Sequence, residues 1–354
     1  MGVRIDAFLE LLVKQRGSDL HLVSCHPPRL RIHGDIQSVH FRVLEAEELQ
    51  RMLNEILNDR QRQLLERDHA VDLAYETEEL GRFRVNIYQQ ARGPAAAFRW
   101  ISAKLASLED LGLPPVVASL IRQPSGLTVV TGPTGSGKST TLAAMIDSIN
   151  ATRRGHILTI EDPIEFRHQR KQCVITQREV GVHAPSFAEA LRNAMHEDPD
   201  VILVGEMRDL ETMSLALTAA ETGVQVFGTL HTNGAVRTID RIVNVFPTER
   251  QDLVRAMLAE NLRMVVSQQL VPTAAGDARV AVREILINTP AAGTLIRSGK
   301  THQLTSILQS GRRIGMLSMD AQLQELLQAG KISPETAQEF AIEKGRVQGG
   351  EKAA

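Results

Sequence analysis

The sequence predicts an α/β protein, in which a parallel-sheet domain follows a smaller α+β domain. An apolar segment at 127–130 runs into a glycine-rich loop and a helix-compatible segment, and apolar strands then alternate with helices. Short strands and helices are also interleaved before residue 100. We therefore expect domains at 1–100 and 116–345, a linker at 101–115, and a disordered tail at 346–354.

The first domain is expected to begin with a helix that stops at Gly17, because apolar residues recur there at helical spacing. Alternating side chains predict strands from Asp19 and Arg29, and His33–Asp35 predicts a hairpin turn into a strand at 36–43. Further elements follow from the same patterns: helices at 45–58 and 60–67, and strands at 71–75, 83–87 and 95–101.

The second domain follows a linker that carries Gly112, Pro114 and Pro115. A capping box, Ser186 to Glu189, opens one of its expected helices. The expected strands are at 127–130, 156–160, 201–204, 225–230 and 280–287. The expected helices are at 116–122, 142–149, 186–196, 209–222, 235–245 and 248–270, followed by a helical tail from residue 289 in which Met319, Leu323, Leu326 and Leu327 share one face.

Composition excludes several classes of protein. Of the 354 residues, 43% are apolar and 23% charged, which is typical of a globular protein. A net charge of −2, with one Trp and two Tyr, predicts neither a general attraction for nucleic acid nor an aromatic RNA-binding surface. Two distant cysteines make no zinc pattern. No apolar run approaches membrane-spanning length, so we expect a cytoplasmic protein that contacts membranes only through partners.

The glycine-rich loop carries the strongest chemical signal. Gly132–Ser139 fits the pattern G-x-x-x-x-G-K-[ST], whose backbone N–H groups turn inward around phosphate oxygens at the start of a helix. Lys138 is expected to reach the β- and γ-phosphates and Ser139 to place its hydroxyl on Mg²⁺. The sequence thus predicts that ATP and Mg²⁺ bind here, through Gly132, Pro133, Thr134, Gly135, Ser136, Gly137, Lys138, Ser139 and Thr140.

Acidic residues and a histidine follow three other apolar strands, and ligands bind at this edge of a parallel sheet. Glu206 ends one strand, but Gly205 stands where an aspartate usually precedes it, so we expect Glu206 to hold Mg²⁺ through water. The base that orients the attacking water is then another acid, with Glu161, Asp162 and Glu165 as the candidates. His231 is a candidate for sensing the γ-phosphate by a hydrogen bond.

Positive charge for the transition state is expected from arginine. Four arginines lie just before the linker, and Arg82 and Arg84 share a strand face by the two-residue period. The candidates are Arg82, Arg84, Arg92 and Arg99. A solvated strand face is the alternative for this group. The basic run at 167–171 is interpreted as a solvated loop.

Taken together, these motifs resemble the secretion-type motor ATPases, and most closely the PilT/PilU group of type IV pilus retraction ATPases. The resemblance covers residues 17–330 and is carried by GSDLHL at 17–22, GPTGSGKST at 132–140, ILTIEDPIEF at 157–166, HEDPDVILVGEMRDLET at 196–212, AETG at 220–223, FGTLHTNGA at 227–235 and DRIVNVFP at 240–247.

This resemblance implies a PAS-like domain joined to a RecA-like ATPase domain in a homo-hexameric ring that retracts pili. It implies Glu206 beside Mg²⁺, His231 near the γ-phosphate, and Arg84 and Arg99 closing over the nucleotide. Glu165 matches the general base of the family, with Glu161 as the alternative. The implied partners are an inner-membrane pilus platform protein and a related retraction ATPase, which places the ring at the inner membrane.

Departures from the family pattern leave alternatives open. The chain lacks the four-cysteine insert of the pilus-assembly and type II secretion relatives, which favours retraction over extension. The segment Ala291–Arg297 matches the AIRNLIR of retraction ATPases only at its ends, and 175–181 and 268–290 are similar to PilU. An accessory or divergent motor, a nucleic-acid translocase, and a non-hydrolysing scaffold are the alternatives.

Overall fold

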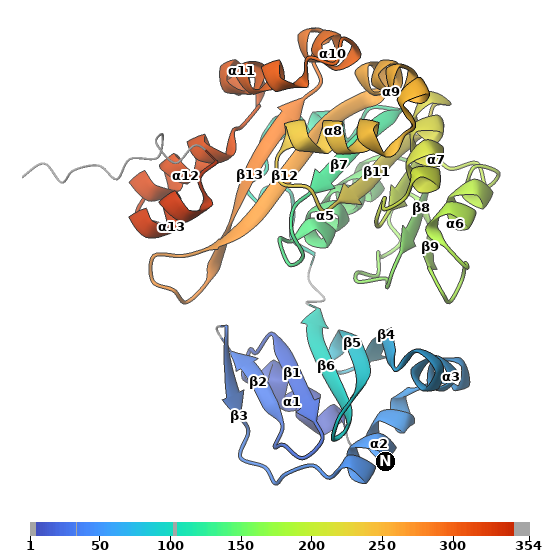
Figure 1. Ribbon diagram of the computed structural model, residues 1–354, viewed down its shortest axis with the longest axis vertical. Helices are drawn as coiled ribbons and strands as arrows, with labels where there is room; N and C mark the ends of the chain where they lie inside the picture. The colour runs from blue at the N-terminus through green and yellow to red at the C-terminus, as the bar shows by residue number, and fades with distance from the viewer. Residues whose placement is uncertain (1–4, 33, 102–104, 343–354) are drawn as a thin grey trace, which may run out of the picture. The chain divides into compact units, whose positions relative to one another are not determined.

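The computed structural model describes residues 5–32, 34–101 and 105–342 (Figure 1). By its contacts the chain divides into two units between residues 104 and 105, and the short segment Pro163–Phe166 groups with the first. His33 in the predicted hairpin and the predicted tail at 346–354 lie outside the described residues. Each unit has its own sheet and its own hydrophobic core.

The first unit is built on a six-stranded sheet of order β3-β2-β1-β6-β5-β4, in which every pairing is antiparallel. Asn58 and Gln61 form a capping box that begins its third helix. The strands are β1 (Asp19–Val23), β2 (Arg29–Ile32), β3 (Asp35–Ser38), β4 (Ala70–Thr77), β5 (Gly81–Gln90) and β6 (Gly93–Ile101), and the helices are α1 (Asp6–Lys14), α2 (Ala46–Ile56) and α3 (Asp59–Asp68).

Alternation along β5 separates the core of this unit from its arginines. Phe83, Val85 and Ile87 are fully buried, so the residues between them face the other side of the sheet. In the register of β5 and β6, Arg84 lies directly opposite Arg99. Directly opposed residues share a face, so the two predicted arginines are neighbours on the face away from the core.

The second unit is built on a seven-stranded sheet of order β13-β12-β7-β11-β10-β8-β9. All its pairings are parallel except that of β12 with the edge strand β13. The strands are β7 (Gly126–Thr131), β8 (His156–Glu161), β9 (Val174–Glu179), β10 (Val201–Val204), β11 (Gln225–Leu230), β12 (Leu262–Pro272) and β13 (Arg279–Ile287). The parallel sheet confirms the predicted fold class and places the ends of β7, β8, β10 and β11 at one edge.

Helices and short 3₁₀ turns complete the second unit, and Figure 1 shows β12 and β13 as a long pair with α12 and α13 beside it. Val271, Val282, Met319 and Leu323 form a separate small core there. None of the helices within the described ranges is both long and apolar enough to cross a membrane. The helices are α4 (Pro115–Leu120), α5 (Lys138–Thr152), α6 (Phe187–Ala194), α7 (Leu210–Glu221), α8 (Ala235–Val245), α9 (Thr248–Asn261), α10 (Pro290–Arg297), α11 (Leu304–Ser310), α12 (Met319–Gln328) and α13 (Pro334–Phe340).

One expectation about this unit is wrong, and one of its strands was not predicted. The helix predicted at 248–270 ends at Asn261, and its second half is β12, a strand held between β7 and β13. The apolar residues of β12 are buried on both faces, and such a run resembles a buried helix in periodicity. The strand that was not predicted is β9. Its side chains are mostly half-exposed, so the sequence has no apolar signal there.

A buried arginine on β13 gives a stability prediction. Arg283 is 4% exposed, and no ion pair to it is present among the described residues. Burial lowers its pKa to about 10. We expect Arg283→Met to raise the free energy of unfolding by about 1–4 kcal/mol at pH 7.5, because it removes a buried charge that lacks a counter-charge. Denaturant unfolding measures this difference.

The sign of its pH dependence follows from the lowered pKa. Below about pH 10, Arg283 is charged in both the folded and the unfolded state, so the folded state carries the full desolvation cost. Above that pH the folded state loses the proton before the unfolded state does. The difference in the free energy of unfolding between Arg283→Met and the wild type should therefore become smaller. Arg297→Met is the control, because Arg297 is 57% exposed and pairs with Glu260. A gain equal to that of the control would contradict the prediction.

Candidate active site

The phosphate loop connects β7, which ends at Thr131, to α5, which begins at Lys138. Gly137 is the N-cap of α5 with a φ of 88°, and Gly132 has a φ of 142°. Side chains rarely adopt such angles, so the pattern places glycine where the backbone turns. The loop therefore lies at the carboxyl edge of the sheet, with the positive end of α5 behind it.

Lys138 lies across this loop. Its Nζ donates hydrogen bonds to the backbone oxygens of Gly132 at 2.9 Å and Pro133 at 3.0 Å. The ammonium group is thus held over the turn that the pattern assigns to phosphates. Ser139, the next residue of α5, is exposed and available as a hydroxyl ligand.

Gly205, which follows β10, stands where an aspartate usually precedes the glutamate, and its surroundings explain this departure. Its N–H donates to the backbone oxygen of Ile160 at 2.7 Å, so the end of β8 lies directly against it. A Cβ at this position would be 3.0 Å from the Ile160 oxygen and 3.2 Å from Glu161 Cα. An aspartate side chain at this position would therefore require the backbone of β8 to shift by a few tenths of an ångström.

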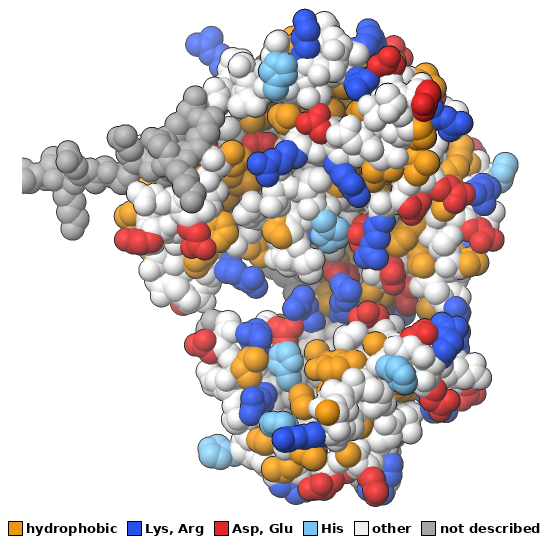
Figure 2. Space-filling model, viewed as in Figure 1, with side chains coloured by type: hydrophobic (Ala, Val, Ile, Leu, Met, Phe, Trp, Pro, Cys, Tyr) orange, Lys and Arg blue, Asp and Glu red, His pale blue; other side chains and the backbone are white. Residues whose placement is uncertain are grey.

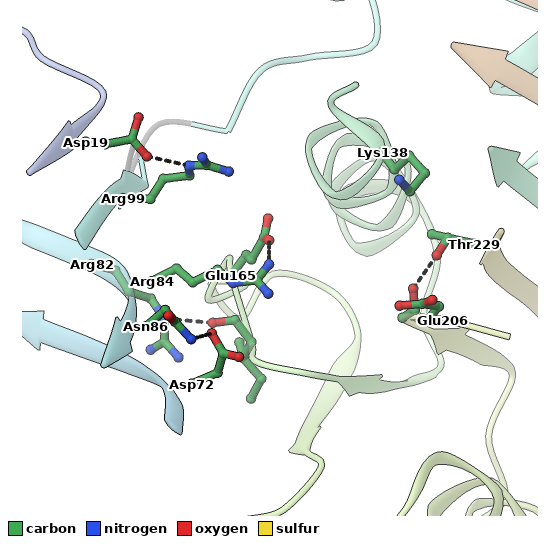
Figure 3. Close-up of polar contacts among 12 residues, drawn as sticks. Asp19, Asp72, Arg82, Arg84, Asn86, Arg99, Lys138, Glu165, Glu206 and Thr229 are labelled. Atoms are coloured by element: carbon green, nitrogen blue, oxygen red, sulfur yellow. Dashed lines mark hydrogen bonds and ion pairs between the residues drawn. The ribbon is translucent and has the colours of Figure 1, made fainter. Parts of the chain in front are cut away.

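The turn that carries Glu206 is fastened to the neighbouring strand β11. The N–H of Met207 donates to the backbone oxygen of Thr229 at 3.0 Å, and the Thr229 hydroxyl donates to the Gly205 oxygen (Figure 3). Met207 also packs over Gly228, where a Cβ would lie 2.7 Å from the Met207 methyl carbon. These contacts fix the position of the Glu206 backbone.

Glu206 accepts hydrogen bonds from two cationic or potentially cationic groups. Arg208 Nη2 donates to Oε2 at 2.6 Å, and His231 Nε2 lies 3.1 Å from Oε1. Burial acts to raise the pKa of Glu206, but the hydrogen bond and charge of Arg208, with His231, lower it overall. The carboxylate therefore stays ionised at neutral pH, as a group that holds Mg²⁺ must.

His231 begins a turn whose backbone is held by side chains of β12 and β13. The N–H of Gly234 donates to Ser267 Oγ at 2.8 Å, and the N–H of Ala235 donates to Glu284 Oε1 at 2.7 Å. Burial raises the pKa of Glu284, although its backbone hydrogen bonds act in the opposite direction. Two side chains from β12 and β13 thus hold the start of α8, directly after His231.

Glu161, the first candidate base, ends β8. Its Oε1 accepts from the Thr159 hydroxyl at 2.7 Å and from Gln177 Nε2 at 3.2 Å. Both donors are neutral, and they come from β8 itself and from β9. This carboxylate is therefore oriented by the sheet at the same edge as Glu206.

Glu165, the other candidate base, groups with the arginines of the first unit. Arg84 Nη1 lies 3.5 Å from Glu165 Oε1, and Arg82 Nε donates to the Ile164 oxygen at 2.8 Å (Figure 3). Arg99 Nε instead donates to Asp19 Oδ1 at 2.9 Å. Arg84 and Arg99 therefore each have a carboxylate nearby in this structure.

Sequence reasoning missed Arg208, Thr229 and Gln268. Arg208 lies two residues after Glu206, and this short spacing was an available signal. Thr229 and Gln268 act on residues far from them in the chain, at separations of 24 and 132 residues. No local pattern indicates such contacts, because they depend on which strands become neighbours.

The donor set fits Mg²⁺ held together with nucleotide phosphates. A hydroxyl from Ser139 and the carboxylate of Glu206 are hard oxygen ligands. In the part of the chain that is described, no three His, Cys, Asp or Glu side chains gather into a metal site of their own. Mg²⁺ is typically bound by one or two protein oxygens plus phosphates and water, which agrees with this set.

A loop of this pattern, at the carboxyl edge of a parallel sheet and beside an ionised glutamate, defines a P-loop ATPase. Residues 3–353 match the family model described as type II/IV secretion system protein, and the chain belongs to that family. It is an ATPase of this family.

Two relatives resemble nearly the whole chain. It is 52% identical over 89% of its length to a twitching motility protein of Neisseria gonorrhoeae, covering 84% of that protein. It is 50% identical over 95% of its length to the type IV pilus retraction ATPase PilT of Pseudomonas aeruginosa, covering 98% of it. A crystal structure of the pilus retraction motor PilT with bound ADP matches with a TM-score of 0.89 and 43% identity, over 97% of this chain and 98% of the other. The predicted resemblance is confirmed.

The Glu206 environment predicts a pH effect. We expect Arg208→Met to move the acid limb of the ATPase pH profile to higher pH, because the variant loses the hydrogen bond and charge that lower the pKa of Glu206 while burial still raises it. The profile of kcat/KM from pH 5 to 8 measures the shift. Arg192→Met is the control, since Arg192 is exposed and pairs with Glu211. An unchanged acid limb in Arg208→Met would contradict the assignment.

Proposed function

We propose that this chain forms a homo-hexameric ring whose Mg²⁺-dependent ATP hydrolysis powers type IV pilus retraction, and hence twitching motility. The observation that carries the proposal is the 50% identity to PilT of P. aeruginosa over almost the full length of both chains. The ADP-bound structure of a retraction motor supports nucleotide use by the same fold.

Each group at the site has a place in this reaction. The loop and Lys138 bind the phosphates, while Ser139 and Glu206 hold Mg²⁺, which neutralises developing charge when bound. His231, which contacts Glu206, lies near the γ-phosphate and can sense it by a hydrogen bond. Glu165 or Glu161 orients the attacking water, and Arg84 and Arg99 supply positive charge as the nucleotide is enclosed.

The proposed partners are an inner-membrane pilus platform protein and a related retraction ATPase. On this proposal the ring works in the cytoplasm, at the inner membrane, where ATP is supplied and membrane contact passes through the platform. No nucleic acid partner is proposed. The net charge of −2 supports this, and Figure 2 shows blue and red side chains interspersed over each unit on the face drawn.

A retraction assay in cells tests the function. We expect Lys138→Ala and Glu206→Gln to lower ATP turnover at least about 100-fold, because they remove phosphate binding and the metal carboxylate. Cells whose retraction ATPase gene is deleted and replaced by either variant should keep surface pili but lose twitching.

Wild-type complementation is the control for this assay. Restoration of twitching only when a second retraction ATPase is also present would assign an accessory role. Normal retraction by a variant without measurable turnover would contradict the proposed motor, and DNA-stimulated turnover of the wild type would favour a translocase.

The choice of base is tested by paired variants. We expect Glu165→Gln to lower kcat more than Glu161→Gln, with ADP affinity within about twofold of the wild type in both, because a base acts on water and not on ground-state binding. Single-turnover hydrolysis and ADP titration separate the two quantities. A larger loss of kcat in Glu161→Gln would assign the role to Glu161.

A further inference from the structure

A buried glutamine on β12, Gln268, lies against the phosphate loop although it belongs to none of the nucleotide-binding motifs. Ser267 pairs with Thr131 at the last position of the ladder between β12 and β7. Gln268 is therefore the first residue of β12 beyond the end of β7, at the level where the loop begins. It is 1% exposed.

The side-chain amide of Gln268 makes two hydrogen bonds that bridge the loop and the helix. Its Nε2 donates to the backbone oxygen of Ser136 at 2.7 Å, and its Oε1 accepts from Thr141 Oγ1 at 2.9 Å. Ser136 lies within the loop and Thr141 in the first turn of α5. Because both ends of the amide are paired in a buried position, its orientation is fixed.

The bond to Ser136 determines where the next N–H points. In a planar trans peptide, the carbonyl of Ser136 and the N–H of Gly137 point in opposite directions. Holding the carbonyl toward Gln268 turns the Gly137 N–H away from β12. Inward-pointing N–H groups at this position are what such loops use to bind phosphate oxygens.

The loop also packs closely against β12. A Cβ on Gly132 would lie 2.1 Å from the backbone oxygen of Gln268, and a Cβ on Gly137 would lie 3.2 Å from its Nε2. The two glycines at the ends of the loop thus both lie against the same residue. A side chain at Gly132 would clash with the backbone of residue 268, so the loop can lie this close to β12 only with glycine there.

We propose that Gln268 is a positioning residue for nucleotide binding, whose amide holds the loop in its phosphate-binding form before the nucleotide arrives. It contacts no phosphate in this account and acts through Ser136 and Thr141. Preorganisation of this kind contributes to ligand affinity, because the loop loses no further freedom on binding. The proposal deepens the ATPase assignment and does not depend on pilus retraction.

The test is nucleotide titration of the full chain with a fluorescent ADP analogue. We expect Gln268→Met, which has similar volume and lacks both hydrogen bonds, to bind MgADP about tenfold more weakly. Thr141→Val removes one bond and should weaken binding about threefold. Gln268→Glu keeps the acceptor for Thr141 but sets a carboxylate oxygen against the Ser136 oxygen, so it should bind more weakly than the methionine variant.

Two readouts separate positioning from general stability. Affinity for AMP, which lacks the β-phosphate, should change less than twofold in Gln268→Met. In ATP turnover the KM should rise about tenfold while kcat stays within about threefold, since no reacting atom is touched.

Gln225→Met is the matched control. Gln225 is also 1% exposed, but it lies at the first position of β11, where its Nε2 donates to the Ile121 oxygen at 2.7 Å. Its loss should lower the melting temperature about as much as Gln268→Met and leave MgADP affinity unchanged.

Three outcomes would overturn the proposal. They are MgADP binding by folded Gln268→Met within twofold of the wild type, an equal loss of affinity in Gln225→Met, and an equal loss for AMP and ADP. If Gln268→Met does not fold, Thr141→Val decides the matter, and wild-type affinity in that variant overturns the proposal. Loss of pilus retraction with unchanged nucleotide affinity in the Gln268 variants would also overturn it, without affecting the proposed motor function.

Discussion

The placement of β7 between β11 and β12 is the constraint on which the rest of this structure depends. Parallel pairing on both sides brings the ends of these strands to the edge of the sheet at which the loop after β7 begins. Thr229 of β11 and His231, the residue directly after this strand, contact the turn that carries Glu206. From β12 come Ser267 and Gln268, which anchor the start of α8 and the loop. Side chains that support the site therefore come from both strands that flank β7.

Charge is balanced locally within each unit. Glu206 has Arg208 and His231 as neighbours, and Glu165 has Arg84. Without Arg208 and His231, the half-buried carboxylate of Glu206 would be protonated more easily, since burial alone raises its pKa. The Glu206 pair resides within the second unit and the Glu165 pair within the first. Each unit thus carries its own set of balanced charges.

The sequence alone predicted the parts of the fold that have local signals. The loop motif, the strand ends at Glu206 and His231, and the strand alternation that buries Phe83 all depend on spacing within a few residues. β9 was missed because an edge strand with half-exposed side chains has no apolar pattern. β12 was assigned to a helix, and with it Gln268 was placed in the wrong kind of element. Its role depends on contact with residues more than a hundred positions away, which no window of sequence contains.

Gly205 has a consequence for the order in which the ligands bind. The end of β8 crowds the position before Glu206, and the proposed Mg²⁺ site therefore has one carboxylate, that of Glu206. A single carboxylate and a hydroxyl bind hydrated Mg²⁺ weakly, because this ion gives up its water reluctantly. On the proposed function, Mg²⁺ would then reach the site already bound to the nucleotide. In the proposed reaction, nucleotide and metal would therefore bind as a single ligand.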